Sequence, residues 1–198
     1  MTKKRKGRLF IISAPSGCGK TTLCEKLLKK MPGVIRSVSF TTRLPRKGEK
    51  NGRDYFFVTK KEFEKKIKRN NLLEWARNFG YYYGTPKDKI LRLLDRGVDV
   101  ILAIDVKGAM KVKKLYPDEV FIFILPPSIS GLRSRLKRRR TDNSLGISMR
   151  IKIARKEISY APKYTYTLVN DDLKTAVNTL EAIIIAERCK IRGKNGQR

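Results

Sequence analysis

The sequence predicts an α/β fold of three layers, in which a central parallel sheet is covered by helices. Short apolar or β-branched runs alternate along the chain with segments of helical periodicity. The runs are apolar at successive positions rather than at alternate ones, which indicates strands that are buried on both faces. One run leads into a glycine-rich turn and then a helix, the context in which phosphate-binding loops occur.

The expected elements alternate in the order that such a fold requires. Strands are predicted at residues 9–13, 34–40, 98–104, 120–125 and 165–169. Helices are predicted at residues 21–31, 86–96, 107–115 and 173–192. Two segments do not fit the alternation: residues 43–84 are rich in charge, glycine and aromatics, and the arginine-dense residues 131–157 are interrupted near "TDNSLG". We interpret both as excursions from the sheet that cover substrates.

Composition narrows the class of protein. A length of 198 residues and a hydrophobic content of 40% indicate one folded domain, residues 1–198. The net charge of +29 attracts polyanions such as nucleotides or nucleic acid. Cys18, Cys24 and Cys189 lack disulfide or metal-site spacing, which favours a reducing compartment. Because no run reaches the ~20 apolar residues of a membrane span, we expect a cytoplasmic protein with residues 1–8 as a frayed basic arm.

A phosphate-binding loop is predicted where the first strand ends. The pattern G-x-x-x-x-G-K-[ST] is matched by the segment Ala14, Pro15, Ser16, Gly17, Cys18, Gly19, Lys20 and Thr21, with alanine in place of the first glycine. Backbone N–H groups of such a loop surround a phosphate, and Lys20 reaches the outer phosphates. The Thr21 hydroxyl would bind Mg²⁺. The sequence therefore predicts a nucleoside triphosphate site.

Two further features indicate a second ligand. Asp105 follows the strand "VDVILAI" at the carboxyl edge of the sheet, where it has a magnesium or substrate role or serves as a turn residue or helix cap. Arg43 and Arg46 flank Pro45, and Tyr55 follows. Guanidinium groups bind phosphate bidentately, so this cluster predicts a second anion site, unless it is only a solvated basic loop.

The order of these motifs resembles that of bacterial guanylate kinases. The resemblance covers nearly the whole chain, through "SAPSGCGKTT", "SFTTRLPRKGEKNGRDYFFV", "LLEWA", "YYYGTP", "ILAIDVKGA", "FILPPS", "RLKRRRTD" and "LVNDDL". It implies a P-loop NTPase fold with a nucleoside-monophosphate-binding insertion at about residues 36–88 and a helical lid at about residues 133–157. It also implies transfer of phosphate from ATP to GMP, with dGMP as a further substrate and Mg²⁺ as cofactor, in a monomer or homodimer. Nucleic acid is expected only as non-specific side binding.

The resemblance also implies roles for individual residues. The ATP side comprises the loop residues Ala14 to Thr21 with Thr22 and Asn170. The guanine side comprises Ser39, Glu74, Thr85 and Asp105, and the GMP phosphate is held by Arg43, Arg46, Tyr55 and Tyr83. The catalytic groups are Lys20, Arg43, Arg135, Arg139 and Arg150. The chemistry agrees, because a carboxylate such as Glu74 accepts from guanine N1–H and N2–H₂, a donor pair that adenine lacks.

Some positions depart from the family pattern or leave their role open. Ala103 stands where the family usually has an acidic residue, and Arg140 where a glycine commonly follows the lid arginine. Of the three consecutive tyrosines only Tyr83 is assigned to the site, and Tyr81 and Tyr82 to packing. Cys18 is either a reactive thiol at a helix N-terminus or a tolerated small residue. The alternatives to a guanylate kinase are a phosphate-loop kinase for another acceptor, a binding module, and a nucleic-acid binder.

Overall fold

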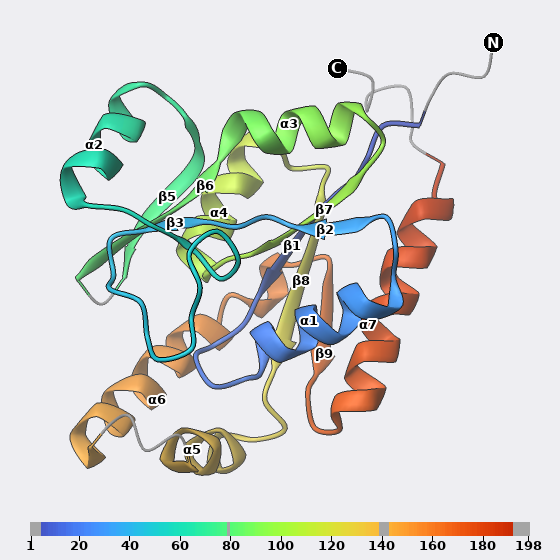
Figure 1. Cartoon of the computed structure of the whole chain (residues 1–198). Coiled ribbons are helices and arrows are strands. Elements are labelled where there is room, and N and C mark those ends of the chain that lie inside the picture. The colour runs from blue at the N-terminus through green and yellow to red at the C-terminus, as the bar shows by residue number, and fades with distance from the viewer. Residues whose placement is uncertain (1–4, 79, 139–142, 192–198) are drawn as a thin grey trace.

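The computed structural model describes residues 5–78, 80–138 and 143–191 (Figure 1). Within these ranges, five strands form a central sheet in the order β2-β7-β1-β8-β9, and all neighbours run parallel. These strands are β1 (Leu9–Ser13), β2 (Val34–Arg36), β7 (Asp99–Ala103), β8 (Val120–Leu125) and β9 (Tyr166–Val169). The predicted parallel sheet is confirmed.

Helices cover both faces of this sheet. Alternate side chains of β1 therefore pack into two separate hydrophobic cores, one on each face. Phe10 and Ile12 pack against α1 and α7, whereas Leu9 and Ile11 pack on the side of α3 and α4. All four side chains are buried, which explains why the strand shows no polar alternation. The helices are α1 (Lys20–Lys30), α3 (Lys87–Asp95), α4 (Val106–Leu115) and α7 (Leu173–Cys189).

The strand expected at residues 34–40 is split between two sheets. β2 ends at Arg36, and Ser37 N donates the next hydrogen bond to Ile101 O of the central sheet. Phe40 then pairs with Phe56 and Gly84 in a second sheet. Its strands in the described chain are ordered β4-β3-β6-β5, with bounds β3 (Phe40–Thr41), β4 (Phe56–Phe57), β5 (Leu72–Asn78) and β6 (Tyr81–Pro86), and α2 (Lys60–Lys68) connects β4 to β5. This unit corresponds to the predicted excursion, whose internal sheet the sequence did not indicate.

The second predicted excursion is helical. It comprises α5 (Ile129–Arg138) and α6 (Ser144–Ile158), and a short 3₁₀ turn, η1 (Ala161–Lys163), follows. The side chain of Asn143 caps α6 by accepting a hydrogen bond from Gly146 N. Figure 1 shows both helices at the end of the sheet where the loop from β1 to α1 lies. Arg139 and Arg140 lie outside the described residues.

The expectation of a frayed arm is wrong for residues 5–8, and residues 1–4 lie outside the described chain. Arg5 Nη2 donates to Asp99 Oδ1 at 2.6 Å. Arg8 is buried, and its Nη1 donates to Glu187 Oε2 of α7 at 2.8 Å. These ion pairs attach the segment to the end of the sheet opposite the phosphate-binding loop. None of the helices in the described ranges has both the length and the apolar character that a bilayer crossing requires.

Candidate active site

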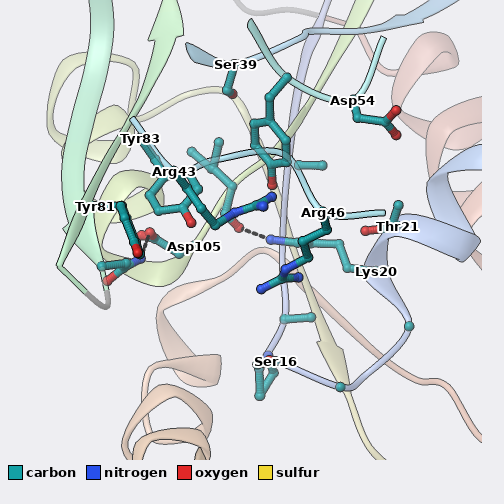
Figure 2. A pocket seen from close by; sticks show the side chains of 18 of the residues that line it. Ser16, Lys20, Thr21, Ser39, Arg43, Arg46, Asp54, Tyr81, Tyr83 and Asp105 are labelled. Atoms are coloured by element: carbon teal, nitrogen blue, oxygen red, sulfur yellow. Dashed lines mark hydrogen bonds between the residues drawn. The ribbon is translucent and has the colours of Figure 1, made fainter. Parts of the chain in front are cut away.

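A cavity of about 470 Å³ opens between the β1–α1 loop, the second sheet and α6 (Figure 2). Most of the residues predicted from the sequence line it: Ala14, Pro15, Ser16, Gly17, Gly19, Lys20, Thr21, Thr22, Ser39, Arg43, Arg46, Tyr55, Glu74, Tyr83, Asp105 and Arg150. Figure 2 shows the cationic ends of Lys20, Arg43 and Arg46 pointing into the same space. The two predicted anion sites therefore share one cavity.

The phosphate-binding loop is held in shape by Asn170. Gly19, the N-cap of α1, has a φ of 82°, a left-handed conformation that favours glycine. A Cβ at this position would lie 2.5 Å from Asn170 Nδ2. The same nitrogen donates to Cys18 O at 2.7 Å, and Asn170 is buried. Asn170 therefore braces the loop from β9 without itself lining the cavity, and the Cys18 side chain is 0% exposed, so the reactive-thiol interpretation is not supported.

Lys20 crosses the carboxyl edge of the sheet. Its Nζ donates to Ile104 O at 2.5 Å, just beyond the end of β7. Burial lowers the pKa of the Lys20 ammonium, and the carboxylates of Asp105 and Glu157 oppose that shift. From α6, Arg150 Nη1 donates to Ser16 Oγ at 3.0 Å, so α6 contacts the loop directly.

Asp105 is both a helix cap and a cavity residue. Its Oδ1 accepts a hydrogen bond from Gly108 N at 2.8 Å in the first turn of α4. Its Oδ2 accepts from Asn78 Nδ2 at the end of β5, which is drawn as a dashed line beside Asp105 in Figure 2. Asp105 therefore serves as the predicted helix cap and also lines the cavity.

Glu74 is a buried acidic residue in the wall of the cavity. Its side chain belongs to β5, the residue is 7% exposed, and Oε1 accepts from Thr85 Oγ1 at 2.6 Å. Burial raises the pKa of Glu74 to about 7. A Cβ at Gly108 would lie 2.6 Å from Glu74 Oε2, so only glycine leaves room for the carboxylate beside α4. Thr85 does not line the cavity but acts on it through this hydrogen bond.

The second anion site is preorganised by an acidic residue. The Nη2 atom of Arg43 donates to Glu49 Oε1 at 2.8 Å and to Oε2 at 3.0 Å. The backbone N–H of Arg46 donates to Glu49 Oε2 at 2.7 Å. Burial raises the pKa of Glu49, but these hydrogen bonds outweigh it and hold the pKa below its usual value. The Arg43 guanidinium lies 5.5 Å from the Tyr55 ring centroid, and Tyr55 packs edge-on against Tyr83. These contacts fix the direction of the Arg43 guanidinium at the cavity wall.

One predicted arginine is not brought into the cavity, and another lies outside the described residues. Arg135 is on α5 and does not line the cavity, and its Nη2 donates to Asp171 O at 3.4 Å. Arg139 lies outside the described residues. The lid assignment of both therefore stays a prediction.

Several residues that line the cavity were not predicted from the sequence: Arg36, Glu49, Asp54, Asn78, Tyr81 and Glu157. The assignment of Tyr81 to packing is wrong, because its ring lines the cavity and is 43% exposed. Tyr82 does pack, stacked on Phe63 at 5.3 Å. Glu157 follows Arg150 by seven residues on α6, so the helical period could have placed both on one face. No local signal marked Asn78.

The oxygen groups on the cavity wall suit a hard cation that takes most of its ligands from water and phosphate rather than from the protein. Among the described residues, no group of three or more His, Cys, Asp or Glu side chains could hold a metal ion. Thr21, exposed at the start of α1, offers a hydroxyl group on the cavity wall, and Asp105 offers a carboxylate. This matches Mg²⁺ at nucleotide sites, which takes one or two protein oxygens besides phosphates and water.

Comparisons with known proteins agree with this geometry. The sequence model of the guanylate kinase family matches residues 6–187. A guanylate kinase of Caldanaerobacter subterraneus subsp. tengcongensis is 48% identical over 191 residues, covering 96% of this chain and 93% of the relative. One of Carboxydothermus hydrogenoformans is 50% identical over 190 residues, with coverages of 96% and 93%. The crystal structure of guanylate kinase from Anaplasma phagocytophilum has a TM-score of 0.81 and 37% identity, covering 94% of this chain and 89% of that one.

Proposed function

The chain belongs to the guanylate kinase family, and on this basis we propose that its cavity transfers the terminal phosphoryl group of ATP to GMP, giving ADP and GDP. The proposal rests on one observation: the phosphate-binding loop, the arginine pair Arg43 and Arg46, and the buried carboxylate of Glu74 line the same cavity of about 470 Å³. Such a cavity places two phosphorylated ligands end to end, which is the arrangement that phosphoryl transfer requires.

The acceptor side is assigned to the second sheet and its connecting loops, together with Asp105 at the edge of the central sheet. Arg43, Arg46, Tyr55 and Tyr83 hold the GMP phosphate, and Ser39, Glu74, Thr85 and Asp105 hold the base. The carboxylate of Glu74 accepts from guanine N1–H and N2–H₂, and the Thr85 hydrogen bond fixes the direction of that carboxylate. Adenine would leave this buried carboxylate with Thr85 but without the two guanine donors, which disfavours AMP by as much as ~10⁴-fold.

The donor side is assigned to the loop and the lid. Residues 14–22 surround the ATP phosphates, Asn170 braces the loop, and Lys20 neutralises the outer phosphates. Arg150 already contacts Ser16 of the loop, and Arg135 and Arg139 join the phosphates when the lid closes. The GMP phosphate oxygen is anionic near neutral pH because the second phosphate pKa is ~6, so the reaction requires no general base.

Mg²⁺ is proposed as the cofactor that accompanies ATP. Thr21 and Asp105 are the residues that would hold it, and the ion would neutralise charge on the transferring phosphate. We also propose dGMP as an alternative acceptor and the cytoplasm, where ATP and reduced thiols occur, as the location.

The test is a coupled assay of ADP formation with ATP and Mg²⁺, in which GMP, dGMP, AMP, UMP and CMP are offered in parallel. Turnover is expected only with the guanine nucleotides. The variant Glu74→Gln keeps the shape of the side chain but presents an amide N–H₂ to the guanine donors, so its kcat/KM for GMP should fall by at least ~10²-fold. Equal turnover with all acceptors, or none with GMP, would refute the proposal.

A further inference from the structure

Donors from two parts of the fold hold both oxygens of the Asp105 carboxylate. Gly108 N, in the first turn of α4, donates to Oδ1 at 2.8 Å. Asn78 Nδ2, at the end of β5, donates to Oδ2 (Figure 2). With one donor, the carboxylate could still rotate about its Cβ–Cγ bond, since that torsion is broad for aspartate. The second donor removes this freedom and ties the second sheet to the central one.

The placement of Asn78 relative to Glu74 directs both groups to the same ligand. The two residues are four apart on β5, and residues separated by an even number on a strand share a face. Both line the cavity, as does Asp105. Gly108 contacts both carboxylates, because its N–H binds Asp105 and its missing Cβ leaves space for Glu74. The result is a pair of oriented carboxylates beside the acceptor site.

We propose that Asn78 is a positioning residue for acceptor recognition, whose amide fixes the Asp105 carboxylate beside Glu74 for a base edge rich in N–H donors. This inference rests on the proposed function, in which that edge belongs to guanine. Two fixed carboxylates match the three N–H bonds of the guanine N1 and N2 groups better than one can. Asn78 contacts Asp105, which is also a proposed Mg²⁺ ligand, so its role in recognition of the base is tested by GMP binding measured without ATP and Mg²⁺.

A purely mechanical role of Asn78 would be to tether β5 to α4, and the chain offers a matched control for that role. Lys111 joins the same two elements: its Nζ donates to Trp75 O at 2.6 Å and lies 4.5 Å from the Trp75 ring centroid. Lys111 does not line the nucleotide cavity. Loss of the Lys111 contact therefore loosens the tether and leaves Asp105 in place.

The experiment compares Asn78→Asp, Asn78→Leu and Lys111→Gln with the wild type at pH 8. Isothermal titration gives the dissociation constant for GMP without ATP, and steady-state kinetics give kcat and the KM for each substrate. Aspartate has the shape of asparagine but repels Asp105, whereas leucine only removes the donor. We expect GMP binding to weaken about tenfold in Asn78→Leu and more in Asn78→Asp, and the KM for GMP to rise by at least as much as kcat falls, since Asp105 is also a proposed Mg²⁺ ligand. Lys111 also lowers the pKa of Glu74, so the comparison is made at pH 8, above that pKa of about 7, where Lys111→Gln should bind GMP within about twofold of the wild type.

Other results of these measurements would overturn the positioning role of Asn78. Wild-type affinity for GMP in Asn78→Asp, or an equal loss in Lys111→Gln, would overturn the positioning role. A fall in kcat with unchanged GMP affinity would also overturn it. Affinity for ADP, unchanged in all variants, shows that the phosphate-binding loop remains folded. If the wild type itself neither binds nor phosphorylates GMP, the proposed function fails, and this inference fails with it.

Discussion

The buried carboxylate of Glu74 makes a quantitative prediction about pH. Burial raises its pKa from the usual 4.5 to about 7, a difference that corresponds to roughly 3 kcal/mol of disfavoured ionisation in the folded protein. An acid whose pKa is raised on folding contributes stability that is complete below pH 4.5. That stability is lost as the pH rises to about 7, because only the folded state still holds the proton. The free energy of unfolding should therefore decline over this window.

Replacement of Glu74 by glutamine removes the ionisation and keeps the shape. Relative to the wild type, Glu74→Gln should gain roughly 2–3 kcal/mol of stability between pH 5 and pH 8. Urea unfolding of both proteins at the two pH values, without nucleotide, measures this difference. Other titrating groups, including Glu157 with a pKa of about 7, are shared by both proteins and cancel in the comparison.

GMP binding should show the opposite trend, since the proposed contact between Glu74 and guanine requires the ionised carboxylate. About one Glu74 in eleven is ionised at pH 6 and most are ionised at pH 8, so the wild type should bind GMP about tenfold more weakly at pH 6 from this group alone. The GMP phosphate titrates near pH 6 in both proteins, and the glutamine variant corrects for it. Parallel pH profiles for wild type and variant, in either unfolding or GMP binding, would refute the assigned role of Glu74.

Three further substitutions test other parts of the structure. Lys20→Met should lower kcat by about 10²–10³-fold without loss of thermal stability, because a buried charge is removed; an unaffected kcat in the coupled assay would exclude Lys20 from the reaction. Gly108→Ala should displace the Glu74 carboxylate, raise the KM for GMP and destabilise the fold by about 1–3 kcal/mol, and kinetics with urea unfolding would detect both effects. Arg8→Ala removes the guanidinium that pairs with the buried carboxylate of Glu187 and should reduce stability by about 3–5 kcal/mol. A loss below 1 kcal/mol in urea unfolding would show that this ion pair does not support the fold.

The parts of the fold that local sequence determines were predicted well. A strand buried on both faces has a recognisable pattern, so β1, β7, β8 and β9 were found close to their observed bounds. The strand at residues 34–40 failed for a physical reason. Its whole length is compatible with strand geometry, and only the partners at Ile101 and Gly84 decide that the chain changes sheets after Arg36.

The site shows the same division between local and tertiary information. The phosphate-binding loop and the arginine cluster lie in continuous motifs, and the structure brings them to one cavity. Asn78 is 27 residues from Asp105 in the sequence, so their contact arises only when β5 packs beside α4. The basic arm was mispredicted likewise, because Arg8 finds Glu187 179 residues away.

The charge of the site differs from the charge of the chain. Among the described residues that line the cavity, five are cationic and five acidic: Lys20, Arg36, Arg43, Arg46 and Arg150 against Glu49, Asp54, Glu74, Asp105 and Glu157. A chain of net charge +29 thus surrounds its ligand space with formally balanced charge. Glu49 holds the Arg43 guanidinium in place, and Asp105 and Glu74 are themselves held by Gly108, Asn78 and Thr85. Because preorganised donors and acceptors need little rearrangement when the ligand arrives, the proposed selectivity for guanine would depend on these fixed directions, and the excess of lysine and arginine elsewhere would add a diffuse attraction for anions.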